Sequence, residues 1–198
     1  MGEGVLFLLK IIFTVLFAPV VYASGVNFYE HLNDYPPPHG EFFKWGMCAF
    51  LLVFLFLHRF EKMYQGGQSA MTELFKFLTP LNHAIARIIP VYTLLLFVVF
   101  VIWGRLHDLS LYIHYFQFFA GFFFMMHIIL LARELQDEES SFIKPSYFFQ
   151  MSLYFVLSLC VMVLLLDLVV WQSTFLQFGG DVFKDARDIY AAAIDKVF

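Results

Sequence analysis

Apolar residues in this chain gather in long continuous stretches and do not alternate with polar residues. Each stretch is about as long as the roughly 20 residues that a helix needs to cross the hydrocarbon core of a bilayer. The pattern predicts an all-α fold, a polytopic transmembrane bundle of about five spans. The predicted spans are residues 4–24, 41–58, 81–104, 111–132 and 148–172.

Proline and small polar residues mark where the predicted spans begin and bend. Thr79-Pro80 predicts an N-cap followed by proline at the first helical position, which would open the third span. Pro90 removes a backbone donor inside that span, so a kink is expected there and the carbonyl of Ala86 is freed.

Two segments have the pattern of amphipathic helices that lie beside the bundle. One is an interfacial helix between spans two and three, over residues 70–78, with Ser69 as its expected N-cap. The other is the C-terminal stretch, for which Gly179-Gly180 suggests a flexible joint and Asp181 an N-cap. The predicted organisation is therefore a transmembrane bundle over 1–178 and an amphipathic helix over 179–198, which either lies on the membrane or packs on a partner protein.

Composition supports lipid as the solvent of this chain. Its 198 residues are 61% apolar and only 14% charged, whereas a soluble domain carries roughly a quarter charged residues. The net charge of −4, without any run of Lys and Arg, argues against nucleic acid as a partner. The expected partners are the bilayer and other subunits of a membrane complex.

Basic residues are unevenly distributed among the predicted connections, and the distribution predicts an orientation. They concentrate between spans two and three and between spans four and five, so the positive-inside rule predicts a cytoplasmic N-terminus in a bacterial inner membrane. Trp45, Trp103 and Trp171 agree, since each falls at the outer end of its span. The C-terminal helix would then lie outside, although its own basic residues argue against that side.

Ionisable residues inside apolar runs are costly in lipid and are candidate functional groups. His83 and Arg87 lie one turn apart in the third predicted span, and His127 lies at a comparable depth in the fourth. The two histidines could ligate a haem b, with Arg87 on a propionate or a quinone oxygen. The alternative is that the histidines only form hydrogen bonds with neighbouring helices.

A second group of ionisable residues is predicted near the opposite membrane surface. Asp167, His114 and Arg105 come at comparable depths near the ends of the fifth, fourth and third spans. They could form an inter-helix polar pair or a proton relay. The centre of each span is almost purely apolar, which favours the structural pair over the relay.

Motifs of known catalytic chemistry are missing from the sequence. It has no HExxH, no nucleophile elbow and no glycine loop that would hold a phosphate. The leading hypothesis is therefore a non-catalytic integral membrane subunit of a larger secretion, transport or energy-coupling complex. The alternatives are a haem b or quinone-binding anchor of a redox enzyme, and a small ion or solute transporter that uses Asp167 and His114.

Overall fold

The computed structural model describes residues 2–35, 39–56, 60–106, 112–137, 145–170 and 173–197. Over these residues the chain forms α-helices joined by short connections, with one 3-10 helix and no strand. In chain order the elements are α1 (Gly2–Asp34), α2 (His39–Phe56), α3 (Glu61–Leu74), η1 (Lys76–Leu78), α4 (Asn82–Ile88), α5 (Val91–Gly104), α6 (Ile113–Asp137), α7 (Pro145–Val170) and α8 (Phe175–Val197).

The structure confirms an all-helical architecture with apolar helices of membrane-spanning length, but not the predicted number of five. Within the described residues, three segments are long and apolar enough to cross a bilayer: Val5–Asp34, Ile113–Asp137 and Ser146–Val169. A fourth is reached only if α4 and α5 together count as one bent span. Helix α2 has 18 residues and is not among the three, and residues 57–58 of its predicted span lie outside the described part.

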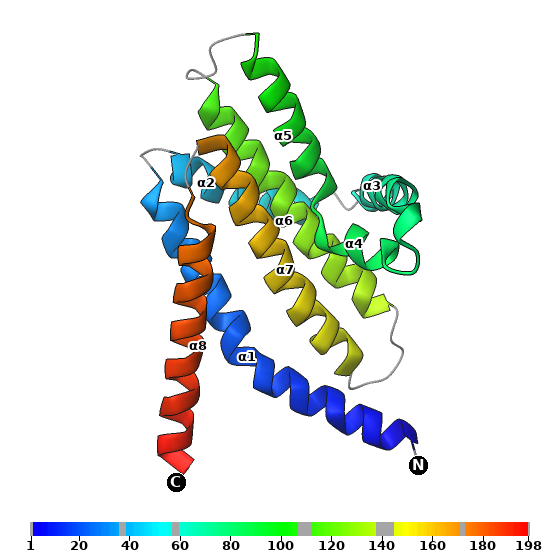
Figure 1. Ribbon diagram of the computed structural model, residues 1–198. Coiled ribbons are helices and arrows are strands. Elements are labelled where there is room, and N and C mark those ends of the chain that lie inside the picture. The colour runs from blue at the N-terminus through cyan, green and yellow to red at the C-terminus, as the bar shows by residue number, and fades with distance from the viewer. Residues whose placement is uncertain are drawn as a thin grey trace.

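Helices α5, α6 and α7 lie side by side, and α2 crosses α6 at very short range (Figure 1). Two glycines permit this approach. A Cβ atom on Gly46 would lie 1.9 Å from the carbonyl oxygen of Phe118, and one on Gly121 would lie 2.0 Å from that of Phe43. Small residues let helix backbones approach in the same way in membrane bundles.

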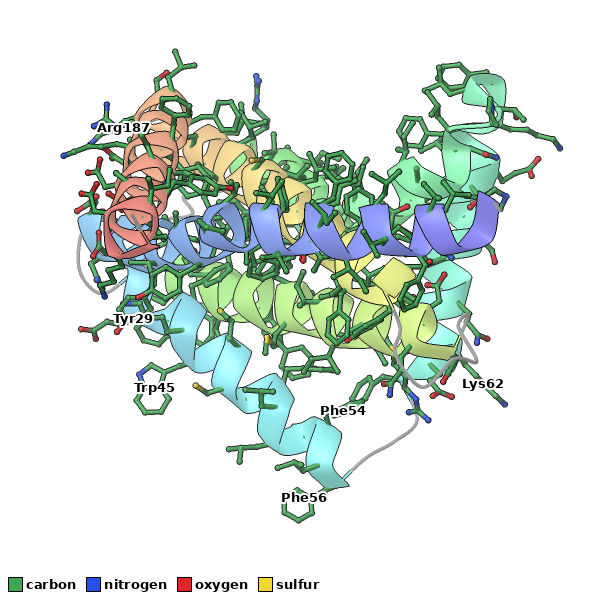
Figure 2. All side chains as sticks on the ribbon, turned by 90° about the horizontal axis from the view of Figure 1, so that it is seen from below. Tyr29, Trp45, Phe54, Phe56, Lys62 and Arg187 are labelled. Carbon is green, nitrogen blue, oxygen red and sulfur yellow. The ribbon has the colours of Figure 1, made fainter. Side chains whose placement is uncertain are left out.

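The outer surfaces of α1 and α2 are apolar and uncovered. Figure 2 shows Trp45 and Phe56 projecting outward from α2, and their side chains are exposed. On α1, Val5, Leu8 and Val15 are more than half exposed. Such surfaces are unfavourable in water and suit contact with lipid or with another protein.

The third predicted span is two helices rather than one kinked helix. Helices α4 and α5 are bent by 70° at the break between Ile88 and Val91. The residue before a proline is driven toward extended backbone, and Ile89 has φ −87° and ψ 119°. Pro90 thus ends α4 completely, which is a larger effect than the predicted kink.

The predicted start of the third span at Thr79-Pro80 is wrong. Helix α4 begins at Asn82 with Leu81 as its N-cap, because the chain first turns through Leu78, whose carbonyl accepts from the Leu81 amide at 2.7 Å. Thr79-Pro80 lies within that turn and is a cis peptide.

The amphipathic segment predicted over 70–78 begins earlier, at Glu61, and Ser69 lies inside α3 rather than at its start. Tyr64, Gly67 and Met71 form its buried face. Tyr64 and Gly67 were not predicted from the sequence, because glycine and tyrosine do not stand out as an apolar stripe. Figure 1 shows α3 nearly along its axis while α5, α6 and α7 lie across the view.

The C-terminal helix is longer than predicted and has no joint. Helix α8 begins at Phe175 and continues through Gly179-Gly180 to Val197. Phe178 and Ala186 are buried, and α8 packs along α1. Tertiary contacts on both sides of the two glycines therefore outweigh their low helix propensity.

Candidate functional site

At the break between α4 and α5, two backbone carbonyls have no helical hydrogen-bond donor. Side chains from other helices donate to them instead. The imidazole Nε2 of His127 on α6 donates to the carbonyl oxygen of Arg87 at 3.0 Å. The hydroxyl of Ser158 on α7 donates to the carbonyl oxygen of Ile88 at 2.9 Å. Both side chains are buried, so these bonds offset the cost of two orphan carbonyls away from water.

An ion pair holds α4 to α6 at the same place. The Nε and Nη2 atoms of Arg87 donate to Oε1 of Glu134 at 3.0 and 2.7 Å. The two side chains are 19% and 34% exposed, respectively. A second pair, Arg133 to Glu61 at 2.6 Å, joins α6 to the start of α3. Both pairs are inter-helix contacts that the sequence analysis did not assign.

A polar groove of about 310 Å³ opens beside the Arg87–Glu134 pair. The exposed His83 lies on its wall, together with Gln68, Ser69 and Thr72 of α3. Tyr64 lies on the buried face of α3. Burial and the Glu134 carboxylate raise the pKa of Tyr64 above its ordinary value. Tyr64 is thus a neutral hydrogen-bonding group at neutral pH, and its hydroxyl accepts from the amide of Gln68 at 2.9 Å.

The two histidines predicted to ligate a haem, His83 and His127, line different hollows. The Nε2 atom of His127 is already engaged by a carbonyl, and the hollow beside its ring holds only about 10 Å³. Pockets for cofactors and drug-sized ligands have hundreds of cubic ångströms. His83, in contrast, lies on the open groove. The haem stays a prediction that absorption spectra of the oxidised and dithionite-reduced protein can test.

The second polar centre lies where α7 ends and α8 begins. The buried carboxylate of Asp167 accepts hydrogen bonds from the backbone amides of Thr174 and Phe175, both at 2.8 Å, and from the Thr174 hydroxyl. The first amides of a helix lack internal partners and carry partial positive charge. Asp167 on α7 therefore acts as an N-terminal cap for α8 and ties the end of α7 to the start of α8.

The C-terminal end of α1 completes this centre. The Nε2 atom of His31 lies 3.0 Å from the hydroxyl oxygens of both Thr174 and Tyr35. One turn earlier, Asn27 donates to Asp185 of α8 at 2.8 Å. The sequence analysis ended the first span at residue 24, but α1 continues to Asp34. The spacing of Asn27, His31 and Tyr35, four residues apart, was the signal for one helical face.

The described contacts of the predicted group Asp167, His114 and Arg105 are the following. Asp167 is occupied by the start of α8. The ring of His114 stacks on Phe42 with centroids 5.4 Å apart, and Arg105 is exposed at the end of α5. The prediction compared depths along the spans and had no information on which helices are neighbours.

Helix α8 carries exposed charged residues on the side opposite its buried ones. Lys184, Asp188 and Asp195 are exposed, whereas Asp181 lines a polar hollow together with Asn27, His31 and Asp34 of α1. Figure 2 shows the side chain of Arg187 directed away from the other helices, and it forms an exposed pair with Asp188 at 3.1 Å. The opposite side of α8 carries the buried Phe178 and Ala186.

Comparison of the chain with protein-family models, with curated proteins and with solved structures gives no match. The class of protein is therefore defined by the fold alone: over the described ranges it is an all-helical bundle with three segments of membrane-spanning length and apolarity, or four if α4 and α5 count as one bent span. Among the described residues, no group of three His, Cys, Asp or Glu side chains is arranged to hold a metal ion.

Proposed function

We propose that this chain is a non-catalytic integral membrane subunit of a larger membrane complex, and that a neighbouring subunit covers α8. The observation that carries this proposal is the position of charged residues of α8 beside the apolar part of α1. The proposal concerns an assembly of the secretion, transport or energy-coupling kind.

Three contacts order α8 along α1 in the antiparallel direction. Thr174 contacts His31, Asp185 contacts Asn27, and the hydroxyl of Tyr190 donates to the carbonyl of Leu16. Both chain ends consequently lie toward the same end of the molecule in Figure 1. Arg187 and Asp188 fall between the second and third contacts, so they lie beside the run of α1 from Leu16 to Asn27.

That part of α1 overlaps the apolar stretch 4–24, which is long enough to cross the hydrocarbon core. The side chains of Arg187 and Asp188 are 67% and 56% exposed, respectively. An ionised side chain at the centre of a bilayer costs about 3 kcal/mol or more. Lipid is thus a poor neighbour for this face of α8, whereas a protein surface with polar groups would solvate it.

The inner polar groups support a non-catalytic role. His127, Ser158 and Asp167 are each engaged in a contact that joins helices or completes a helix end. A proton relay or cofactor site would need such groups to face a ligand or a water path. The bonds that these three side chains form are consistent with a structural role. The exposed faces of the bundle are therefore the candidate surfaces for function.

The test is the native mass of the protein extracted from its own membranes in a mild detergent. We expect a species well above the 23.2 kDa of the single chain, containing at least one other protein in fixed ratio. The matched control is the same chain produced alone in a foreign host, which should run as a smaller particle. A 23.2 kDa monomer from the native membrane would overturn the proposal.

A further inference from the structure

The polar groove beside the α4–α5 break is built by three helices and has the size of a small ligand site. Ser69 and Thr72 come from α3, His83 and Arg87 from α4, and Glu134 from α6. The volume of about 310 Å³ lies at the lower end of the roughly 300 to 1,000 Å³ of ligand pockets. The groove therefore has room for the polar part of a ligand.

The groove lies where the apolar parts of two neighbouring helices end. On α6 no Asp, Glu, Lys or Arg precedes Arg133, and α5 contains none of these residues. Arg87 and Glu134, which line the groove, come just beyond these apolar parts. In a bilayer this level is the boundary between the hydrocarbon core and the headgroup region, where lipid phosphate and ammonium groups lie.

Exposed apolar side chains flank the groove at the end of α3 and before α4. Leu74 and Leu81 are both more than half exposed. Leu74 follows Thr72 of the groove by two residues, and Leu81 precedes His83 by two. Helix α3 crosses the direction of α5, α6 and α7 (Figure 1), as an amphipathic helix does at a membrane surface. A polar groove beside exposed apolar side chains offers the two surfaces that a lipid headgroup and its acyl chains need.

We propose that this groove binds the headgroup of a phospholipid that carries both a phosphate and a primary ammonium group. The guanidinium of Arg87, the imidazole of His83 and the hydroxyls of Ser69 and Thr72 are donors for the phosphate oxygens. The carboxylate of Glu134 accepts from the ammonium group. A monomer and a complex would both hold this lipid, so the proposal goes beyond the proposed function and does not depend on it.

The charges of the lining select a headgroup that carries both signs. Arg87 bonds only Oε1 of Glu134, at 3.0 and 2.7 Å, and a carboxylate has about four acceptor positions. The side chain of Glu134 is 34% exposed, so it can bond an ammonium group in the groove as well. A headgroup with a phosphate alone would meet this carboxylate without a compensating positive charge, which is unfavourable.

The lining also distinguishes a primary ammonium group from a quaternary one. None of its six described residues is Phe, Tyr or Trp, whereas quaternary ammonium groups are recognised by cages of such rings. A quaternary ammonium group also has no N–H to donate to Glu134. An ethanolamine headgroup therefore fits this groove better than a choline headgroup.

The first experiment measures lipid binding to the purified full chain in a mild detergent by native mass spectrometry. Phosphatidylethanolamine, phosphatidylcholine and phosphatidylglycerol with the same acyl chains are added separately at equal concentration. We expect one phosphatidylethanolamine per chain, retained at least tenfold better than either of the other lipids. Equal retention of the three lipids, or a preference for one of the other two, would overturn the proposal.

A competition experiment separates a lipid from a soluble ligand with the same headgroup. Soluble phosphoethanolamine lacks the acyl chains that contact the exposed apolar side chains, so we expect it to displace the lipid only at a concentration at least a hundredfold higher. Displacement at equal concentration would assign the groove to a soluble compound and overturn the lipid as its ligand.

Two tryptophan variants locate the bound lipid. Ser69→Trp fills the groove from an exposed position of α3 and keeps both Arg87 and Glu134. Ala70→Trp, the matched control, places the same ring on the next exposed residue, which does not line the groove. We expect Ser69→Trp to reduce retention of phosphatidylethanolamine at least tenfold and Ala70→Trp to leave it unchanged. Equal retention by the two variants would overturn the proposal.

A second pair of variants tests the carboxylate. Glu134→Gln keeps the size of the side chain and removes its charge. Glu61→Gln makes the same change in the other ion pair between α3 and α6, outside the groove. The readout is the ratio of phosphatidylethanolamine to phosphatidylglycerol retained, which a general loss of stability does not change. We expect this ratio to fall at least fivefold in Glu134→Gln only, and an unchanged ratio in that variant would overturn the proposal.

Discussion

The α4–α5 break and the outer face of α8 both carry charged residues next to apolar helices, but the two regions satisfy them in opposite ways. At the break, Arg87 bonds Glu134. His127 and Ser158 bond the two carbonyls that lack a helical donor. On α8, Lys184, Asp188 and Asp195 are exposed. Polar groups that are paired inside a fold contribute to its stability, whereas charges that face outward depend on what lies outside. The comparison predicts large stability effects at the break and large assembly effects on α8.

The largest expected loss of stability comes from removing Glu134. Glu134→Ala removes one carboxylate from the partly buried guanidinium of Arg87 and should lower the free energy of unfolding by about 2 kcal/mol. This is below the roughly 3 to 5 kcal/mol of a fully buried pair, because a third of the Glu134 side chain is exposed. Unfolding in mixed micelles measures it, with Asp188→Ala as the control. Equal losses in the two variants would remove the contrast between the regions.

The next effect is expected at the junction of α7 and α8. Asp167→Ala removes the acceptor for the Thr174 and Phe175 amides and should cost about 1.5 kcal/mol, within the range for lost helix caps. Asp167→Asn should cost less because it keeps an acceptor oxygen. Amide hydrogen exchange at residues 174–178 should accelerate in the Ala variant while exchange in α6 stays unchanged. Uniform acceleration would show that Asp167 stabilises the whole bundle instead.

A smaller loss is expected from Ser158→Ala. The carbonyl of Ile88 loses the hydroxyl that bonds it at 2.9 Å, and one unsatisfied buried acceptor costs about 1 kcal/mol or somewhat more. Ser69→Ala, on an exposed position of α3, is the matched control and should be neutral. The same mixed-micelle titration compares the two. If Ser158→Ala were also neutral, the break would be supported by other groups.

The smallest stability effect is expected on α8. Asp188→Asn should change the free energy of unfolding of the isolated chain by less than about 0.5 kcal/mol, as for most exposed positions. In native membranes the same change should weaken assembly measurably, because the carboxylate faces the partner. A substantial loss of stability in the isolated chain would mean that Asp188 serves the fold itself.

Part of this architecture could be predicted from the sequence because it depends on local pattern. Long apolar runs predicted the helical class, Pro90 predicted a kink, and the C-terminal periodicity predicted an amphipathic helix. Each signal lies within one continuous stretch of the chain. Where α8 begins was not predictable in this way, because Asp167, seven residues before Thr174, holds that end, and helix propensity at Gly179-Gly180 argued for the opposite.

The candidate sites show the same division. The sequence alone singled out Arg87, His127 and Asp167, since ionisable residues in apolar runs are few and costly. It did not assign the contacts that the structure shows: His127 bonds the carbonyl of Arg87, and Asp167 bonds the start of α8. Their position in apolar runs showed that these groups needed hydrogen-bond or ion-pair partners. Only the tertiary structure decided which groups these partners are, because helix neighbours are chosen by packing between residues far apart in the chain, such as the close approach at Gly46 and Gly121.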